Sequence, residues 1–383
     1  MEEGRDISSL SKEFDRVLLL DLDSSESQKA ASSLLETSIS LPKSANFPFE
    51  EPTTLENIRS SRPSQTELPK LSLSPEQVED RIHGAYVGRA IGSLLGQDVE
   101  DWTRAKMIGY LNDSGRFPLD GFFTFSNLPP QTIAKYELTE AWGEKVENSK
   151  STRQNLGFVL SNLGLSKSSG EKPIHKSPMR ESIGEFNRRD FWGLITPGDQ
   201  ELGAEFAFRE ADETLSKNGV YSAMWVAGMI AATFVTNDIP TIIRAGMEQI
   251  PESSRLADIL DSILEWHELE IDYGTCVYRI HEMWHETDPL HHFHSLPNSA
   301  LIAIALLLGE GDFAKSICFA VESCFATSIN GATTGAILGV LLGAKALPTI
   351  WTSRISETFE TGLSDPATLS YREAANLTLR MIG

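Results

Sequence analysis

The most distinctive group of potential metal ligands in the sequence is the string His281-Glu282-Met283-Trp284-His285. On a helix, the two histidines would lie one turn apart, where both can bind one zinc ion while the glutamate acts as a base. His291 falls at the spacing of a third ligand. However, Asp288 stands where such peptidases have a glycine, and His292 and His294 make the whole segment rich in histidine. A zinc peptidase is therefore kept only as an alternative, beside a structural metal site and simple hydrogen bonding.

The composition makes nucleic acids and anionic membranes unsuitable partners. Lysine and arginine total 33 and aspartate and glutamate 54, so the formal net charge is −21. A surface this acidic repels phosphate groups, although a local pocket for a small anion remains compatible with it. The longest apolar stretch, residues 331–344, contains four glycines and is shorter than the roughly 20 residues of a membrane span. We expect a buried helix there.

Cysteine usage and the start of the chain both favour a cytoplasmic location. Cys276, Cys318 and Cys324 are too few for a disulfide framework. The chain opens with Glu2 and Glu3 and lacks the basic start and apolar run of a secretory signal.

Two regions differ in their organisation. Residues 1–74 are rich in serine, proline and glutamate, and predict a largely irregular arm with one or two short helices that dock on the body. Residues 75–383 are dominated by helical signals, beginning with the N-cap sequence Ser74-Pro75-Glu76-Gln77. Strand-like alternation is nearly absent, so the predicted fold is all-α, a compact bundle of many helices. The further helices are expected over Gly203–Ser216, Ser222–Phe234, Pro240–Glu248, Ser254–Trp266, Asn298–Leu308, Asp312–Phe325 and Asn330–Ala344.

Two of the expected helices carry a glycine at every fourth position. The two sets are Gly84, Gly88, Gly92 and Gly96, and Gly331, Gly335, Gly339 and Gly343. Each glycine inside a helix costs about 1 kcal/mol relative to alanine. A face without Cβ atoms allows close approach of a backbone, a ligand or a metal. We favour tight packing between helices, and expect both helices at the centre of the fold with their ends bordering the pocket.

Several strings resemble the ADP-ribosylglycohydrolase family and occur in that family's order. The resemblance spans about Glu79 to Trp351. It implies a compact all-α bundle with a cleft that receives ADP-ribose. The strings are Arg81–Gly92, Gly96–Glu100, Arg180–Gly184, Asp190–Gly193, Pro197-Gly198, Asn218–Tyr221, Gly309–Phe313 and Asn330–Gly335.

The resemblance fails at the acids that hold two magnesium ions in the family. Two such ions need several carboxylates to offset their mutual repulsion. Ala326 and Ser328 stand where the family has two aspartates. The family's other run of aspartates has no counterpart between Phe117 and Trp142, where the acids are Asp120, Glu137 and Glu140. We therefore predict no metal and no other cofactor.

One acid of the family's site is retained. Glu100 matches a glutamate that lies near the scissile ribose bond in the family, and could act as a general base, with Asp98 as the second catalytic candidate. The alternative without a catalytic role is that Glu100 is an ordinary solvated acid at a helix end. The binding candidates are Trp102, His291, His294, Thr327, Ser328 and Asn330.

Three hypotheses follow, in order of preference. The first is a metal-free protein that acts on a small organic metabolite, as a cofactor-independent isomerase or cyclase in a biosynthetic pathway or as a binding protein. The second is a pseudoenzyme that binds ADP-ribose or an ADP-ribosylated protein without cleaving it. The third is residual ADP-ribosyl hydrolysis by another set of ligands. The sequence identifies neither the substrate nor the oligomeric state.

Overall fold

The computed structural model describes residues 4–20, 24–124, 128–136, 138–139, 179–183, 189–361 and 366–382. It divides into two compact units, Met1–Glu50 and Glu51–Gly383. The smaller unit holds a 3-10 helix η1 (Ser8–Leu10) and the helices α1 (Ser11–Leu18) and α2 (Ser25–Ser40). Helix α2 begins where the Ser24 hydroxyl accepts a hydrogen bond from the Ser27 N–H. The region expected to be largely irregular therefore contains a helix of 16 residues.

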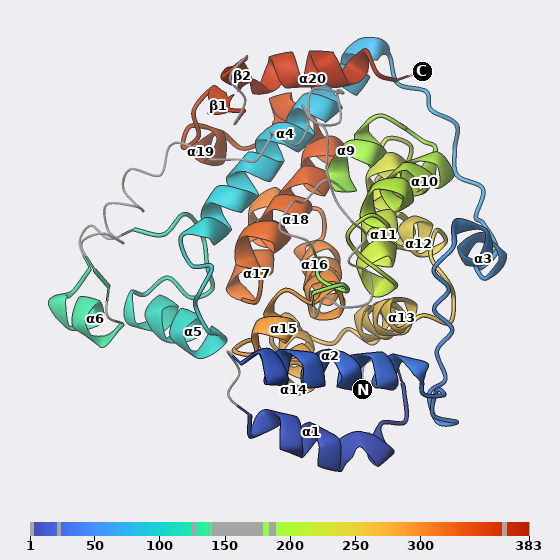
Figure 1. The fold of residues 1–383 in the computed structure, drawn as a ribbon. Coiled ribbons are helices and arrows are strands. Elements are labelled where there is room, and N and C mark those ends of the chain that lie inside the picture. Colours follow the sequence, from blue (N-terminus) through green and yellow to red (C-terminus); the bar gives the residue numbers. More distant parts are fainter. Residues whose placement is uncertain are drawn as a thin grey trace. The chain divides into compact units, whose positions relative to one another are not determined.

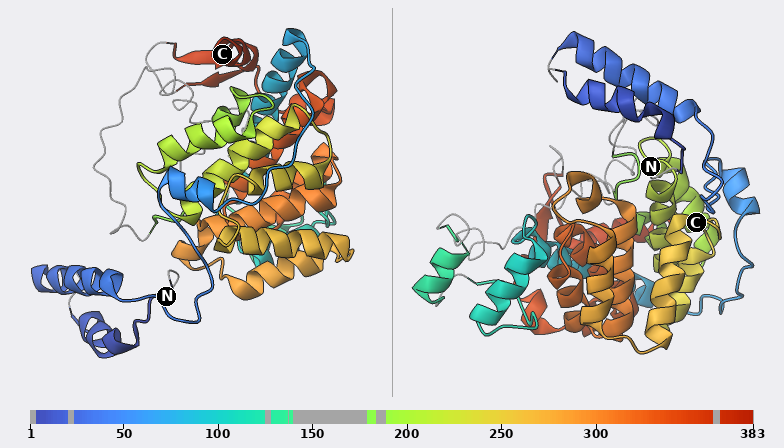
Figure 2. Two further views of the ribbon diagram at one scale, coloured as in Figure 1. Left: turned by 90° about the vertical axis from the view of Figure 1, so that its right-hand side faces the viewer. Right: turned by 90° about the horizontal axis from the view of Figure 1, so that it is seen from below.

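The larger unit is built almost entirely from helices (Figures 1 and 2). Helices α9 to α13 gather on one side of the pair α4 and α18, and α5 and α6 lie on the other side. The all-α prediction is confirmed. The helices are α3 (Leu55–Ser60), α4 (Pro75–Gln97), α5 (Arg104–Asp113), α6 (Pro130–Lys135), α9 (Arg189–Leu194), α10 (Gln200–Ala211), α11 (Asn218–Thr233), α12 (Ile239–Met247), α13 (Arg255–Glu268), α14 (Tyr273–Met283), α15 (Pro289–His292), α16 (Ser295–Gly309), α17 (Phe313–Glu322), α18 (Thr327–Leu342), the 3-10 helix η3 (Ala344–Ala346), α19 (Thr349–Thr352) and α20 (Tyr371–Leu379).

The described strands form one small hairpin. The strands β1 (Thr358–Glu360) and β2 (Thr368–Ser370) pair antiparallel, with Phe359 opposite Leu369. Among the described residues, no helix combines the length and the apolar composition that crossing a bilayer requires.

Helix α4 begins as its sequence predicts. The Ser74 hydroxyl accepts a hydrogen bond from the Gln77 N–H at 3.3 Å, and the Gln77 side chain accepts one from the Ser74 N–H at 2.8 Å. This reciprocal pair satisfies two backbone donors at the helix start, and Pro75 occupies the first helical position. The preceding residues 51–74 lie along the helices of the same unit: Arg59 pairs with Glu205 at 2.6 Å, and Arg62 donates to the Gln249 carbonyl at 2.9 Å.

The two glycine faces meet each other in the core. Gly84, Gly88 and Gly92 lie against Gly339, Gly335 and Gly331 respectively, so α4 and α18 run antiparallel. A Cβ atom added to any of these glycines would overlap a backbone carbonyl of the other helix. Gly96 continues the series and lies against Thr327. The prediction of tight helix packing at the centre of the fold is confirmed, and it explains why small residues recur at this spacing.

A methyl group at this contact should be strongly destabilising. We expect Gly88→Ala to lower the free energy of unfolding by about 3 kcal/mol, because the opposing atoms belong to the backbone and cannot rotate away. Urea denaturation followed by circular dichroism measures the change. The control is Gly274→Ala at the exposed start of α14, where a Cβ would meet only the Asp272 side chain. This variant should be neutral or more stable by up to about 1 kcal/mol. Wild-type stability in Gly88→Ala would contradict the packing.

Candidate functional site

The end of α4 meets the start of α18, because the two helices are antiparallel. Thr327, the first residue of α18, is fully buried, and its hydroxyl donates to the Gly96 carbonyl at 2.8 Å. Glu100 lies just beyond the end of α4 and is half-buried. This place, which we call the α4–α18 junction, brings together three of the predicted site residues, Glu100, Thr327 and Ser328.

Glu100 is held in one orientation by the first turn of α18. Its Oε2 accepts a hydrogen bond from the Ser328 N–H at 2.8 Å. The same oxygen lies 3.2 Å from the Thr327 hydroxyl, whose single proton is shared with the closer Gly96 carbonyl. The N-cap residue of α18 is Ala326, whose side chain cannot accept a hydrogen bond, so Glu100 supplies the missing acceptor. Among the described residues no donor reaches Oε1, and the Glu100 residue is half-buried. The junction thus presents a carboxylate with one anchored oxygen and one oxygen without a hydrogen-bond donor.

A second group of predicted residues gathers around Asn298 in α16. The Asn298 Oδ1 accepts from the Ala326 N–H at 3.1 Å and from the Asn330 Nδ2 at 2.9 Å. Its Nδ2 donates to the carbonyls of His294 at 2.8 Å and His292 at 2.9 Å. Asn298 and Asn330 are fully buried. Asn330 therefore holds α16 against the start of α18, and a ligand could contact its side chain only after local rearrangement.

The remaining predicted residues do not share contacts with Glu100. Trp102 is 6% exposed and packs its ring against Tyr110 and Phe123, with centroid distances of 5.1 and 5.8 Å. Asp98 is buried at the C-cap of α4. The His294 Nδ1 accepts from the Leu296 N–H at 3.2 Å and caps α16.

The zinc-peptidase arrangement does not form on a helix. Helix α14 ends at Met283, and Trp284 is extended, so His285 leaves the helix face that carries His281. His291 accepts a hydrogen bond at its Nδ1 from the His285 N–H at 3.1 Å. Within the part of the chain that the structure describes, no group of three or more His, Cys, Asp or Glu residues is arranged to hold a metal ion.

His281 instead supports the turn that leads into α18. Its Nε2 lies 2.9 Å from the Ser323 carbonyl, and its ring lies 4.9 Å from that of Phe325. Cys324 and Phe325 have φ angles of 66° and 59°, a left-handed conformation that is costly for residues with side chains. Burial lowers the pKa of His281 to about 4, so the neutral imidazole donates its Nε2–H to Ser323 at neutral pH.

The residues at the α4–α18 junction do not fit the two magnesium ions that the family resemblance implies. Among the described residues of the junction, Ala326 offers no side-chain oxygen, Ser328 offers a hydroxyl, and the one carboxylate, that of Glu100, already accepts a hydrogen bond from the Ser328 N–H. Asp120 pairs with Arg116 at 2.9 Å, whereas Glu137 and Glu140 lie outside the described residues. One carboxylate would leave most of the charge of two divalent ions uncompensated.

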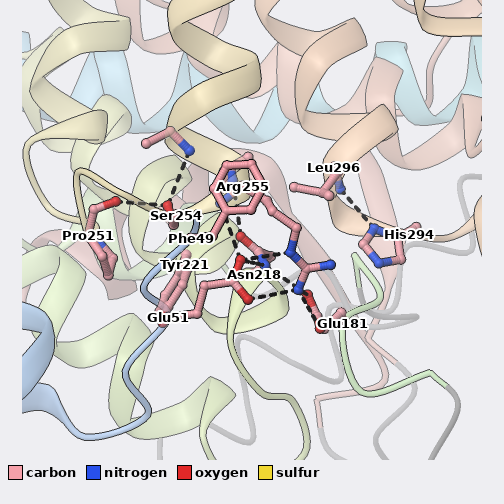
Figure 3. A network of polar contacts seen from close by, with 12 residues as sticks. Phe49, Glu51, Glu181, Asn218, Tyr221, Pro251, Ser254, Arg255, His294 and Leu296 are labelled. Atoms are coloured by element: carbon pink, nitrogen blue, oxygen red, sulfur yellow. Dashed lines mark hydrogen bonds and ion pairs between the residues drawn. The ribbon is translucent and has the colours of Figure 1, made fainter. Parts of the chain in front are cut away.

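Sequence reasoning did not find a buried ion cluster that joins three distant segments (Figure 3). The Arg255 guanidinium contacts Glu51 at 2.8 Å and Glu181 at 2.7 Å. The Asn218 Nδ2 donates to both carboxylates, at 2.7 and 2.8 Å. Burial opposes the ionised form of Glu51. The hydrogen bonds and the charge of Arg255 outweigh this effect of burial, so the pKa of Glu51 is lowered. Glu181 and Asn218 belong to two of the family-like strings, whereas nothing in the sequence around Glu51 or Arg255 marks them.

Removal of the Glu100 carboxylate should loosen the start of α18. We expect Glu100→Ala to lower the free energy of unfolding by about 1 kcal/mol, the usual effect of losing a helix cap. Faster amide hydrogen exchange in the first turn of α18 should accompany the change. Asp101→Ala is the matched control, because Asp101 is the exposed neighbouring acid. If Glu100→Ala and Asp101→Ala behave alike, the capping role is wrong.

His281 should make the protein less stable in mild acid. Its folded pKa of about 4 lies below the ordinary value of 6.5, so the unfolded chain binds the proton more readily. Its contribution to stability is complete above pH 6.5 and declines as the pH falls towards 4, by at most about 1.4 kcal/mol per pH unit. Urea denaturation at pH 7 and pH 5 measures the free energy of unfolding. Its decrease between the two pH values should be smaller in His281→Gln than in wild type.

The control for this comparison is His285→Gln, because His285 is exposed. This variant should lose as much unfolding free energy between pH 7 and pH 5 as wild type. Burial raises the pKa of Glu286, 3.8 Å from His281, which acts in the opposite direction. Glu286 is present in all three proteins. An unchanged loss in His281→Gln would contradict the burial of a neutral imidazole.

A protein-family model matches most of this chain. The model of the ADP-ribosylglycohydrolase family matches residues 74–378. No curated protein matches the chain. A solved structure described as an ADP-ribosylglycohydrolase-related protein complex is similar, with 13% sequence identity, coverage of 80% of this chain and 98% of that chain, and a TM-score of 0.40. Since the family match extends over most of the sequence, the chain belongs to the ADP-ribosylglycohydrolase family.

Proposed function

We propose that this family member acts on a small organic metabolite without metal ions, as a cofactor-independent isomerase or cyclase. The observation that carries the proposal is the oriented, half-buried Glu100 carboxylate, anchored through Oε2 at the first turn of α18 and without a donor at Oε1. A general base needs this combination of fixed geometry and one oxygen within reach of the substrate. Ala326 and Ser328 stand at positions where the family resemblance implies aspartates, so two carboxylates fewer surround that base.

The chemistry assigned to Glu100 needs no second reactant. Oε1 takes a proton from the bound metabolite, and the same proton, or one from water, returns to another atom of that molecule after the double bond moves or the ring closes. Atoms and electrons balance within the one substrate. The remaining rate enhancement comes from holding the substrate in a reactive conformation. The Ser328 hydroxyl at the edge of the junction is a candidate hydrogen-bonding group for it.

Binding of ADP-ribose without cleavage is the second candidate. The family match over residues 74–378 favours it, because the ADP-ribose cleft is the property that the family resemblance implies. A junction with Glu100 as its carboxylate would then bind the nucleotide but lack the several carboxylates that two-metal hydrolysis needs. The two candidates differ in whether the bound molecule is converted.

Native mass spectrometry of the full chain, purified from its own cells, should show a bound organic metabolite and no magnesium. Incubated with a metabolite extract of those cells, the protein should convert one compound into another of equal mass and different retention time. The conversion should persist in EDTA, because it needs no metal. It should fall at least about a hundred-fold in Glu100→Gln, as expected for loss of a general base, and remain in Asp101→Asn.

Other outcomes would decide against an isomerase. Bound ADP-ribose that the protein leaves intact would support the second candidate. Release of ADP-ribose from an ADP-ribosylated protein, dependent on magnesium, would restore the hydrolase function and overturn the proposal.

A further inference from the structure

A cavity of about 340 Å³ lies between the loop that follows α5 and the segment around α19. Its size falls at the lower end of the range for sites that bind small organic molecules. The described residues of the α4–α18 junction do not line it. The side chains used in the argument below are Arg116, Asp120, Phe122, Ile350, Trp351 and Arg354.

The cavity has an apolar and aromatic lining, in which Phe122 is half-buried and Trp351 is buried. The rings of Phe122 and Trp351 lie 4.9 Å apart between centroids, inclined by 58°. Beside them, the Ile350 side chain is 76% exposed, which is unusual for a large aliphatic residue. A flat apolar ligand would cover this surface and remove it from water, and the aromatic rings favour a planar partner.

One guanidinium at the cavity is available to an anion. The Arg354 guanidinium lies 5.4 Å from the centre of the Phe122 ring and forms no ion pair among the described residues. Arg116, in contrast, is occupied by Asp120 at 2.9 Å and by the Phe122 carbonyl at 2.9 Å. Two arginines and one aspartate leave this cavity with a local positive charge, in a protein whose formal net charge is −21. Such a place attracts small anions that the rest of the surface repels.

We propose that this cavity is a binding site for a planar aromatic carboxylate. The ring of the ligand packs on Phe122 and Ile350, and the carboxylate of the ligand pairs with the Arg354 guanidinium. The buried Trp351 supports the Phe122 ring from the protein side. A guanidinium presents two parallel N–H groups that match the two oxygens of a carboxylate. The proposal does not depend on the function assigned to Glu100, since the two sites share no residue.

Isothermal titration calorimetry on the full chain tests the site with benzoate, 2-naphthoate and indole-3-acetate. We expect saturable binding with one ligand per chain, tightest for the two larger ring systems because they cover more apolar surface. The neutral 2-naphthalenemethanol should bind about ten-fold more weakly or not at all, because it cannot pair with Arg354. Added salt should weaken the binding of the acids.

Two arginine variants separate this site from nonspecific attraction of acids. Arg354→Gln should weaken the binding of 2-naphthoate about ten-fold, and Arg354 is exposed, so the fold should be retained. Arg279→Gln is the matched control: Arg279 lies over the Trp266 ring at 4.9 Å but does not line the cavity, so binding should be unchanged. The proposal is overturned if none of the three acids binds, or if Arg354→Gln binds 2-naphthoate as tightly as Arg279→Gln.

Discussion

The contact between the glycine faces of α4 and α18 is the constraint on which the larger unit depends. Backbone lies directly on backbone from Gly84 to Gly96, so neither helix can slide along the other without a collision. Each glycine costs about 1 kcal/mol of helix propensity. The close approach that the glycines allow adds dispersion contacts along the whole interface between the two helices. Because both helices are fixed lengthwise, the residues at their ends are fixed as well.

At the α4–α18 junction, the packing of the two helices also determines the position of the Glu100 carboxylate. Helix α18 begins without a capping side chain of its own, since Ala326 stands at its N-cap. The carboxylate that replaces the cap comes from Glu100, beyond the end of the partner helix. A change that separated the two helices would therefore both uncap α18 and release the candidate base. The same carboxylate is thus both the cap of α18 and the proposed base, through different oxygens.

The sequence was most informative where the signal is local or periodic. The Ser74–Gln77 cap and the glycine repeats predicted the start and the central position of α4, because caps and repeats express backbone geometry directly. Helix α14 was not among the expected helices, and the motif at its end does not show that the helix stops at Met283. Trp102 and Asn330 were chosen as ligand-binding residues by their position in the chain, and sequence does not show that both side chains are buried in packed surroundings.

The ion cluster around Arg255 has a consequence for how this chain can evolve. Its charged members come from residues 51, 181 and 255, so no local mutation can replace the cluster as a whole. Loss of the arginine alone would leave two buried carboxylates without a cation, and loss of one acid would alter the charge around the other two groups. Neutral drift is thus blocked at each position separately. In related sequences, these three positions should change together or not at all. Their covariation would then show that the three segments are in contact.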